Sequence, residues 1–454
     1  MIQPAPVLKR EISLLQATSI NMIDMVGIGP FVVMPLVMSM MASPLFLWAW
    51  VFGAVIAFAD GMIWSELGTK FPLAGGSYNF LKEAYGPKWG RLMSFLFVWQ
   101  TCLQAPLVVA SGAIGFSQYF GFLVPLSAWQ GKMVSGLVVL LITFLLYRNI
   151  KTIGKMAVFL WAGVIITIAW IIISGFTHRQ VHYSFLPNGD AQSMFSLSFA
   201  LLLGQASVKT IYSYLGYYNV CHLGGEIRDP DNNIPRSIFI SIFCIALLYL
   251  LMNVSIVSVI PWQEAMNSKF IVSSFMEKIY GHRTAILATV LVLWIAFASL
   301  FAVVLGYSRV PYAAAADGHF FPAFARLHPT KGFPYVSLLF LGGIGFVFSL
   351  LFKLGDTISA ILAMRILVQF IGQAAGVVLL RRQAPANPNY FRMWLYPLPV
   401  ILSIWIWLFV FYSTGKLALW GLALTLCGVA AYYASRHLWT RLPAAPLPET
   451  PPGN

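Results

Sequence analysis

Four ionisable side chains lie inside long apolar runs of this chain: Asp24, Asp60, Lys209 and Arg365. A lone charge at the centre of a bilayer costs roughly 2.5–3.5 kcal/mol on insertion scales, so each should face the protein interior or find a partner. The two acids and two bases could neutralise one another in a static network, and the two bases could instead extend to the membrane surface. A buried carboxylate could alternatively take up and release a proton.

A run of helix-breaking residues follows Asp24 by one helical turn. Gly27, Gly29 and Pro30 interrupt an apolar run that extends over residues 12–40. Irregular backbone at membrane depth is tolerated only where it is buried in protein or lines a wet cavity. The N–H groups that start the second half suit a carboxylate, and the carbonyls that end the first half suit an amine. The alternative is a proline-kinked helix packed through small residues.

A second interruption is predicted near Gly216, within the aromatic segment of residues 212–219. The two interrupted spans are the first and the sixth, so they cross the membrane in opposite directions and head two successive five-span blocks. Inverted repeats with a midplane site between two discontinuous helices have this arrangement. The pair of breaks therefore favours a transport site over a simple kink.

The composition indicates an all-α polytopic membrane protein. Of 454 residues, 59% are hydrophobic and 9% are charged, which excludes an ordinary soluble domain. We predict twelve transmembrane helices, because the apolar runs are near 20 residues long and a membrane barrel would show alternating segments of about ten. The predicted spans are 12–40, 45–67, 92–120, 133–146, 153–176, 194–223, 238–260, 284–314, 336–352, 357–380, 395–412 and 417–433.

The basic residues predict the orientation of these spans. With the N-terminus inside, 19 Lys and Arg residues fall in cytoplasmic segments and seven in external ones. Both termini are therefore expected in the cytoplasm. The basic residues behind the net charge of +14 mark the cytoplasmic face, so no nucleic-acid partner is expected. We expect a multi-pass protein of the cell membrane, in bacteria the inner membrane. The expected parts are a cytoplasmic N-terminus (1–11), two five-helix repeats (12–176 and 177–380), two further helices (381–441) and a disordered tail (442–454).

Several motifs resemble the amino acid–polyamine–organocation superfamily of transporters, which have the LeuT-type fold. Gly27-Ile28-Gly29 is similar to the family's break in helix 1, and Ser65-Glu66-Leu67-Gly68 to the segment after helix 2. The stretches 225–236 and 308–318 resemble the loop after helix 6 and the end of helix 8. The resemblance implies a 5+5 inverted repeat with two added C-terminal helices, and secondary transport of amino acids or amines by proton symport or exchange.

Some positions depart from the family pattern. Gly225 replaces the first of two acidic residues usual after helix 6, and the helix 5 position where many members have a lysine is about Gly163. Gly29-Pro30-Phe31 and Asp60 look closer to the polyamine-transporting branch, but Met34 stands where that branch has an acid. An amino acid permease is therefore predicted, with a polyamine or organic-cation transporter as the alternative.

The predicted site residues form three groups. We expect the substrate to contact the two breaks. The charged residues are expected to couple transport to an ion or to balance one another's charge. Ser299 is the helix 8 hydroxyl nearest the family's sodium position, but one hydroxyl makes a weak sodium site. Charged residues at the cytoplasmic helix ends could form an inner gate or be plain interfacial charge. The substrate group is Ile23, Val26, Gly27, Ile28, Gly29, Tyr212, Ser213, Tyr214, Leu215, Gly216 and Tyr217; the coupling group is Asp24, Asp60, Lys209, Ser299 and Arg365; the gate group is Glu66, Arg91, Glu226 and Arg309.

Other function classes find little support in the sequence. None of the seven histidines forms H-E-x-x-H, there is no G-x-S-x-G, and the four cysteines form no C-x-x-C pair, so we expect neither an enzyme nor a metal site or cofactor. A channel or a transporter-like nutrient sensor remains a rival. The external segment 121–132 contains no cysteine, so no disulfide-linked accessory subunit is expected, and the partners are the lipid bilayer and a small-molecule substrate.

Overall fold

The computed structural model describes residues 8–181, 196–352, 361, 364–383 and 390–439, and this part of the chain is almost entirely helical. Its only extended pairings are two isolated bridges, Ile12 with Ile227 and Ala74 with Leu223. The helices of the first half are α1 (Leu14–Met25), α2 (Gly29–Met41), η1 (Pro44–Phe46), α3 (Leu47–Lys70), α4 (Ser77–Ala84), α5 (Gly86–Leu123), α6 (Ala128–Leu146) and α7 (Ile150–Thr177).

The second half continues in the same way. Its helices are α9 (Leu197–Tyr214), α10 (Asn219–His222), η2 (Gly224–Glu226), α11 (Pro230–Val257), α12 (Trp262–Ala265), α13 (Ile271–Tyr280), α14 (His282–Tyr307), α15 (Arg309–Ala316), η3 (Pro322–Ala325), α16 (Tyr335–Leu351), η4 (Ile366–Ile371), α18 (Gly372–Gln383), α19 (Leu398–Ser413) and α20 (Lys416–Trp439).

These helices confirm a polytopic helical membrane protein. Seven helices of the described part are long and apolar enough to cross a bilayer, and α1 with α2 makes an eighth as a bent pair. The helices α16 and α19 are apolar but shorter. Parts of predicted spans six and ten, and the predicted tail, lie outside the described residues. The exact number of twelve spans and the inverted repeat therefore stay predictions.

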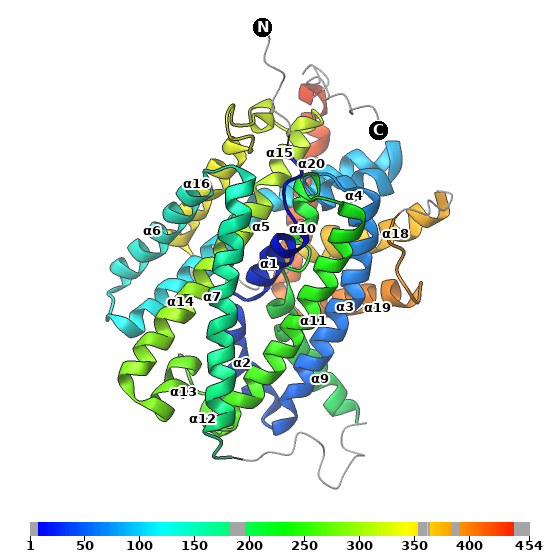
Figure 1. Cartoon of the computed structure of the whole chain (residues 1–454). Helices are drawn as coiled ribbons and strands as arrows, with labels where there is room; N and C mark the ends of the chain where they lie inside the picture. The colour runs from blue at the N-terminus through cyan, green and yellow to red at the C-terminus, as the bar shows by residue number, and fades with distance from the viewer. Residues whose placement is uncertain (1–7, 182–195, 353–360, 362–363, 384–389, 440–454) are drawn as a thin grey trace.

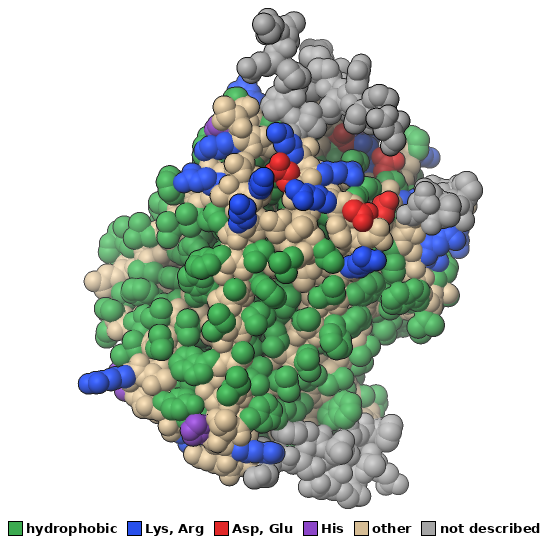
Figure 2. Space-filling model, in the orientation of Figure 1, with side chains coloured by type: hydrophobic (Ala, Val, Ile, Leu, Met, Phe, Trp, Pro, Cys, Tyr) green, Lys and Arg blue, Asp and Glu red, His purple; other side chains and the backbone are tan. Residues whose placement is uncertain are grey.

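The bundle has an apolar belt between two polar ends. The helices α4 and α15 lie at one end, which we call the α4–α15 end, whereas α12 and α13 lie at the opposite end (Figure 1). Figure 2 shows hydrophobic side chains over the middle of the molecule, and Lys, Arg, Asp and Glu gathered toward the α4–α15 end. Hydrocarbon tails match such a belt, and charged side chains match the two interfaces.

The first span is broken where the sequence predicts. Ser13 and Gln16 form a capping box that starts α1, and the helix ends at Met25. Residues 26–28 are non-helical, and α2 then begins with Pro30 in its first turn, where the missing N–H costs nothing. The two halves are bent by 46°. Pro30 therefore starts a second helix rather than kinking a continuous one.

The chain also closes on itself at the α4–α15 end. The backbone N–H groups of Glu11 and Ile12 donate to the carbonyl of Glu226 at 3.0 and 2.9 Å, and Arg228 N–H donates to Ile12 at 2.9 Å. Gly75 N–H donates to the His222 carbonyl at 2.9 Å. The segment that precedes α1 and the segment that follows the second break are thus joined by main-chain hydrogen bonds, and α10 is joined to the loop before α4.

The charge pattern predicts that the α4–α15 end faces the cytoplasm. In a variant whose four cysteines are replaced, a cysteine at Lys416 should react with a membrane-impermeant thiol reagent added to intact cells, and one at Lys155 should not; both lysines are exposed. Permeabilised cells, in which both positions should react, provide the control. The reverse labelling pattern in intact cells would refute the predicted orientation.

Candidate functional site

The two helix breaks lie in direct contact at the centre of the molecule. Gly216 has a φ of 125°, which few residues other than glycine adopt. A Cβ on Gly216 would lie 2.7 Å from the backbone nitrogen of Met25 and 2.9 Å from the Asp24 carbonyl carbon. Glycine at position 216 is therefore required both by its own backbone conformation and by the backbone of the other break.

Two asparagines join the breaks by hydrogen bonds. Asn219 Nδ2 donates to Asp24 Oδ2 and to the carbonyl of Ala302 on α14, each at 2.8 Å. Asn21 Oδ1 accepts from the backbone N–H of Val220 at 2.9 Å. These bonds tie α1, α10 and α14 together, and they satisfy backbone and carboxylate groups that the breaks would otherwise leave unpaired.

Tyr249 on α11 contacts both breaks from another side. Its hydroxyl oxygen lies 2.8 Å from the Met25 carbonyl and 3.1 Å from the Ser213 carbonyl. A hydroxyl has one proton, so Tyr249 donates to one of these two carbonyls at a time. The ends of α1 and α9 thus share the Tyr249 hydroxyl as a hydrogen-bond donor.

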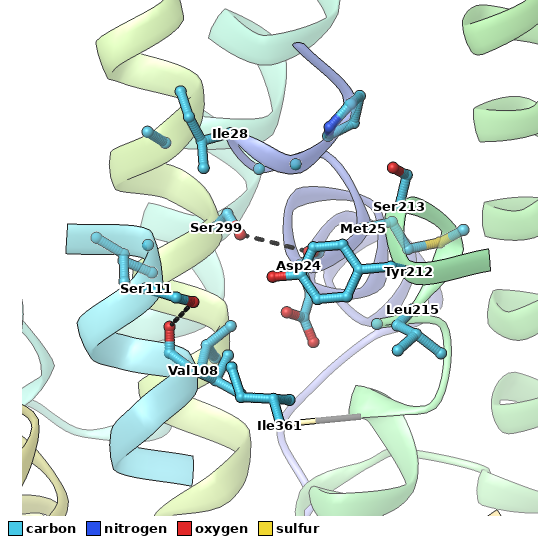
Figure 3. Close-up of a pocket in the computed structure, with 18 of the residues that line it drawn as sticks. Asp24, Met25, Ile28, Val108, Ser111, Tyr212, Ser213, Leu215, Ser299 and Ile361 are labelled. Carbon is cyan, nitrogen blue, oxygen red and sulfur yellow. Dashed lines mark hydrogen bonds between the residues drawn. The ribbon is translucent and has the colours of Figure 1, made fainter. Parts of the chain in front are cut away.

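A cavity of about 90 Å³ opens beside the two breaks. The ring of Tyr212 and the carboxylate of Asp24 point into the same space, opposite Ser111 on α5 and Ser299 on α14 (Figure 3). Ser299 Oγ lies 3.4 Å from the Asp24 carbonyl oxygen, to which it donates. The lining residues are Asp24, Met25, Gly27, Ile28, Gly29, Pro30, Val32, Val33, Val108, Ser111, Gly112, Tyr212, Ser213, Leu215, Gly216, Tyr218, Ala296, Ser299, Leu300, Val303, Tyr307, Ile361 and Arg365.

Backbone donors at the first break are available to a ligand. The N–H groups of Gly27, Ile28 and Gly29 donate to no other backbone group among the described residues. All three residues line the cavity, and Gly29 is the first residue of α2. The N-terminus of a helix with free N–H groups is a natural binding site for an anion such as a carboxylate.

Arg365 supplies a fixed positive charge to the cavity wall. It is 3% exposed and donates to Gln369 Oε1 at 2.9 Å and to the hydroxyl of Tyr218. Its guanidinium carbon lies 5.1 Å from the ring centroid of Tyr218 and 5.7 Å from that of Tyr307. It forms no ion pair with Asp24 or with any other acid in the described part of the chain. An acid and a base thus face the same cavity without neutralising each other by direct contact.

The predicted substrate residues divide between the cavity and the packing around it. Seven of the eleven line the cavity: Gly27, Ile28, Gly29, Tyr212, Ser213, Leu215 and Gly216. Ile23, Val26, Tyr214 and Tyr217 do not. The hydroxyl of Tyr214 donates to the Trp50 carbonyl at 3.1 Å and that of Tyr217 donates to Asp60, so both side chains point toward α3.

Sequence reasoning missed the walls of the cavity that come from unbroken helices. Val108, Ser111 and Gly112 on α5 and Ala296, Val303 and Tyr307 on α14 were not predicted. On α14 a signal was present, because Ser299, Val303 and Tyr307 are spaced by four residues and share one helix face. On α5 and near Ile361, the sequence shows no comparable signal.

Asp60 and Lys209 do not join the predicted charge network. Asp60 accepts from Trp64 Nε1 at 3.0 Å, from Ser403 Oγ at 2.9 Å, from Trp407 Nε1 at 3.4 Å and from the Tyr217 hydroxyl. Lys209 is half-buried and forms no ion pair within the described ranges. Mutual neutralisation of the four charges, one of the alternatives that the sequence left open, is therefore not found among the described residues. Neutral donors from α3, α19 and the second break satisfy Asp60 instead.

Three of the four predicted gate residues take part in two separate ion pairs. Arg309 Nε and Nη2 each lie 2.9 Å from an oxygen of Glu226, and both side chains are almost fully buried. Glu66 pairs with Arg381, which was not predicted, and also accepts from the Met393 N–H at 2.9 Å. Arg91 is exposed and takes part in no ion pair among the described residues, so it does not belong with the other three.

A tryptophan fills the space beside Gly163. A Cβ on Gly163 would lie 2.3 Å from Trp294 Nε1, which donates to the Leu160 carbonyl at 3.0 Å. Trp161 on the same helix donates to Met22 Sδ at 3.2 Å. A lysine at position 163 could enter only if Trp294 moved, so packing explains the departure noted in the sequence.

Comparison with known proteins identifies the family. The sequence matches the amino acid permease family over residues 12–432. The chain belongs to that family. This permease is 27% identical to the serine/threonine exchanger SteT of Bacillus subtilis, over 94% of this chain and 97% of the relative. It is 26% identical to the mouse Asc-type amino acid transporter 1, over 94% and 81% of the two chains.

A human relative is also named as an amino acid transporter. The permease is 27% identical to the human large neutral amino acids transporter small subunit 2, over 96% of this chain and 82% of the relative. All three relatives are named as amino acid transporters or exchangers, and none as an enzyme. The family confirms the predicted superfamily, and with it a transporter rather than an enzyme.

Close packing at Gly27 gives a testable prediction. A Cβ on Gly27 would lie 2.6 Å from Ser299 Oγ and 3.1 Å from Ser299 Cβ, whereas on Gly29 the nearest atom would be Tyr212 Cε1 at 3.5 Å. Gly27→Ala should therefore destabilise the protein by about 1–3 kcal/mol, a typical cost of overpacking. Thermal denaturation in detergent should show that Ser299→Ala restores part of this loss, and that Gly29→Ala, the matched control, costs less. Equal losses for Gly27→Ala and Gly29→Ala would contradict the packing described.

Proposed function

We propose that this permease is a secondary active transporter that moves a small neutral amino acid across the cell membrane by alternating access. The observation that carries the proposal is the cavity at the junction of two broken helices. It combines free backbone N–H groups, backbone carbonyls, an acid and a base. A zwitterion needs donors for its carboxylate and acceptors for its ammonium group, and the junction supplies both.

The substrate would lie with its carboxylate on the first break. The N–H groups of Gly27, Ile28 and Gly29 are the donors proposed for it. The ammonium group would be received by the carbonyl of Tyr212, which lines the cavity, with Asp24 as a charged neighbour. Ile23 and Tyr214, whose carbonyls the sequence also suggests, do not line it. Ser111, Ser213 and Ser299 line the same cavity and offer hydroxyls to a polar side chain.

The size of the cavity favours a small side chain. At about 90 Å³ the cavity is well below the roughly 300–1,000 Å³ typical of sites for drug-sized ligands, which favours a small substrate. The bacterial relative is named as a serine/threonine exchanger, which fits a small substrate with a hydroxyl. Exchange of one amino acid for another is therefore part of the proposal, beside proton symport.

Arg365 disfavours the polyamine alternative. A guanidinium remains charged under all physiological conditions, and Arg365 is almost fully buried in the cavity wall. A polyamine would place several positive charges next to it in a medium of low dielectric constant, where like charges repel strongly. Asp24 alone would not offset that repulsion.

For coupling, we propose Asp24 as the principal proton site. It lines the cavity, lies one turn before the first break and is held by Asn219 on the segment that follows the second break. Asp60, the alternative, accepts from four donors that occupy both of its oxygens, so a proton would have to displace one of them. Ser299 with one carbonyl offers too few oxygens for a convincing sodium site, since hard cations take about six.

The remaining features of the proposal concern the membrane. The cluster of basic side chains at the α4–α15 end supports a cytoplasmic location for both termini, and the bacterial relative supports an inner-membrane protein. The 5+5 inverted repeat remains the proposed architecture. The permease is proposed to work without a disulfide-linked subunit.

Reconstitution into liposomes tests the proposed function. With labelled amino acids and polyamines offered under imposed proton or sodium gradients, small neutral amino acids such as serine, threonine and alanine should accumulate or exchange, and polyamines should not. A Gly29→Leu variant, whose side chain would enter the cavity beside Tyr212, serves as the inactive control. Uptake of polyamines alone, or a single-channel conductance, would contradict the proposal.

The proton site has its own test. Asp24→Asn keeps the size of the side chain and removes its titration, so uptake driven by a proton gradient should fall at least about tenfold, equivalent to about 1.4 kcal/mol. Exchange of internal for external amino acid should persist, because it needs no net proton movement. Asp60→Asn is the matched comparison and should affect both modes alike. Proton-driven uptake at the parental rate in Asp24→Asn would exclude this site.

A further inference from the structure

A column of buried polar side chains runs from the cavity toward the α4–α15 end. On α5, Gln104 and Gln100 lie one and two turns beyond Val108, which lines the cavity. In the segment of η4 and α18, Gln369 and Gln373 follow Arg365 at intervals of four residues. Tyr307 on α14 and His222 on α10 complete the set. All six side chains are at least nine-tenths buried.

These side chains lie around one another between four helices. The ring centroids of His222 and Tyr307 are 5.3 Å apart, and the Arg365 guanidinium carbon lies 5.7 Å from the Tyr307 ring. Gln104 lies beside the Tyr307 hydroxyl. At the far end, the Ser77 hydroxyl on α4 donates to Gln373 Oε1 at 2.7 Å. The column therefore connects the cavity wall at Arg365 with α4.

Most polar atoms of the column have no hydrogen bond within the described part of the chain. By standard geometry, both side-chain polar atoms of Gln100 and of Gln104 lack a hydrogen bond, as do the Tyr307 hydroxyl and both ring nitrogens of His222. Only looser polar contacts remain, from the Tyr307 hydroxyl to Gln104 and Tyr218 and from His222 to the Gly75 backbone. The Oε1 atoms of Gln369 and Gln373 accept hydrogen bonds from Arg365 and Ser77 respectively, but their Nε2 atoms are unpaired. Thr101 Oγ1, next to Gln100, is unpaired as well. Ten unpaired atoms are thus concentrated in one part of the core.

Such a concentration requires a ligand with both donors and acceptors. Native proteins leave only a few buried polar groups per 100 residues unsatisfied, and bound water is the usual partner of those that lack protein contacts. In a membrane, ionisable side chains within spans face the bundle interior or a water-filled cavity and mark substrate or ion pathways, and Arg365 and His222 are two such side chains here. The amides, hydroxyls and imidazole of this column include both hydrogen-bond donors and acceptors. Water can pair with both, whereas an ion of one sign can pair with only one kind.

We propose that a chain of water molecules fills this column and forms a hydrated route between the substrate cavity and the α4–α15 end. At about three hydrogen bonds per buried water, ten unpaired atoms correspond to about three or four molecules. The route hydrates the cavity floor at Arg365, Tyr218 and Tyr307. None of its side chains takes part in the Glu226–Arg309 ion pair, so that pair need not open for the route to be hydrated.

Radiolytic hydroxyl-radical labelling in ¹⁸O-water, read by mass spectrometry, tests the water chain directly in the intact protein. His222 and Tyr307 should be oxidised at least about five times faster than Tyr214 and Tyr249, because radicals form on waters held next to the side chain. The two control tyrosines are buried to a similar degree, at 0% exposed against 5% for Tyr307 and 1% for His222, but their hydroxyls already donate to main-chain carbonyls. Labelling of Tyr307 and His222 no faster than the controls would overturn the proposal.

A double variant, Gln100→Met with Gln104→Met, removes four of the unpaired atoms at nearly constant volume. If the column holds water, labelling of Tyr307 should drop toward the level of Tyr249, and the maximal uptake rate should fall with little change in the substrate concentration for half-maximal uptake. If the column is dry, the variant should be more stable to heat, with labelling and uptake unchanged, and the proposal fails.

The control is Gln130→Met, since Gln130 lies in the exposed capping box of α6 and should alter neither labelling nor uptake rate. Gln373→Met gives a second test of the column if the double variant does not fold. The uptake reading rests on the proposed function, whereas the labelling does not. Normal column labelling without amino acid uptake would therefore refute the proposed function and leave the water chain standing.

Discussion

The contact between the two broken helices is the constraint on which the rest of this structure depends. Backbone groups freed by a break cannot turn to lipid, so they must find partners inside the protein. Each break supplies partners for the other: Gly216 allows the backbones to touch, and Asn219 bonds to Asp24 while Asn21 caps the start of α10. What remains unpaired faces the cavity. The groups proposed to bind the substrate are thus those that the contact between the two breaks leaves without a partner.

Buried charge is managed in three different ways. At the α4–α15 end, Glu226 and Arg309 form a two-pronged ion pair, whose mutual attraction offsets the loss of hydration. Asp60 accepts hydrogen bonds from neutral donors on α3, on α19 and at the second break. It therefore links α19 to that break. Asp24 and Arg365 remain without a direct ion pair and share the cavity. Only this last arrangement leaves charge available to a substrate.

Much of the architecture could be predicted because the bilayer imposes simple rules. Apolar runs gave the helices, and wherever the chain is described, each predicted span coincides with helix to within several residues, as for 153–176 against α7 (Ile150–Thr177). The short helices α4 and α13 were missed, since they carry charges and lie outside the spans. Gly27, Gly29 and Gly216 were found because their local effect on the backbone needs no tertiary information.

The sequence by itself determined the class of protein, the two breaks and the presence of four charges at membrane depth, since hydropathy and glycine or proline chemistry act locally. Only the tertiary structure decided which charges meet. Whether Tyr217 turns to the cavity or to Asp60, and whether Glu66 pairs with Arg91 or with Arg381, depends on the rotation and tilt of helices distant in sequence. The cavity walls from α5 and α14 likewise arise where three or four helix faces come together. The same holds for the polar column between Arg365 and α4. Helical periodicity places residues on a face, but only packing chooses what that face contacts.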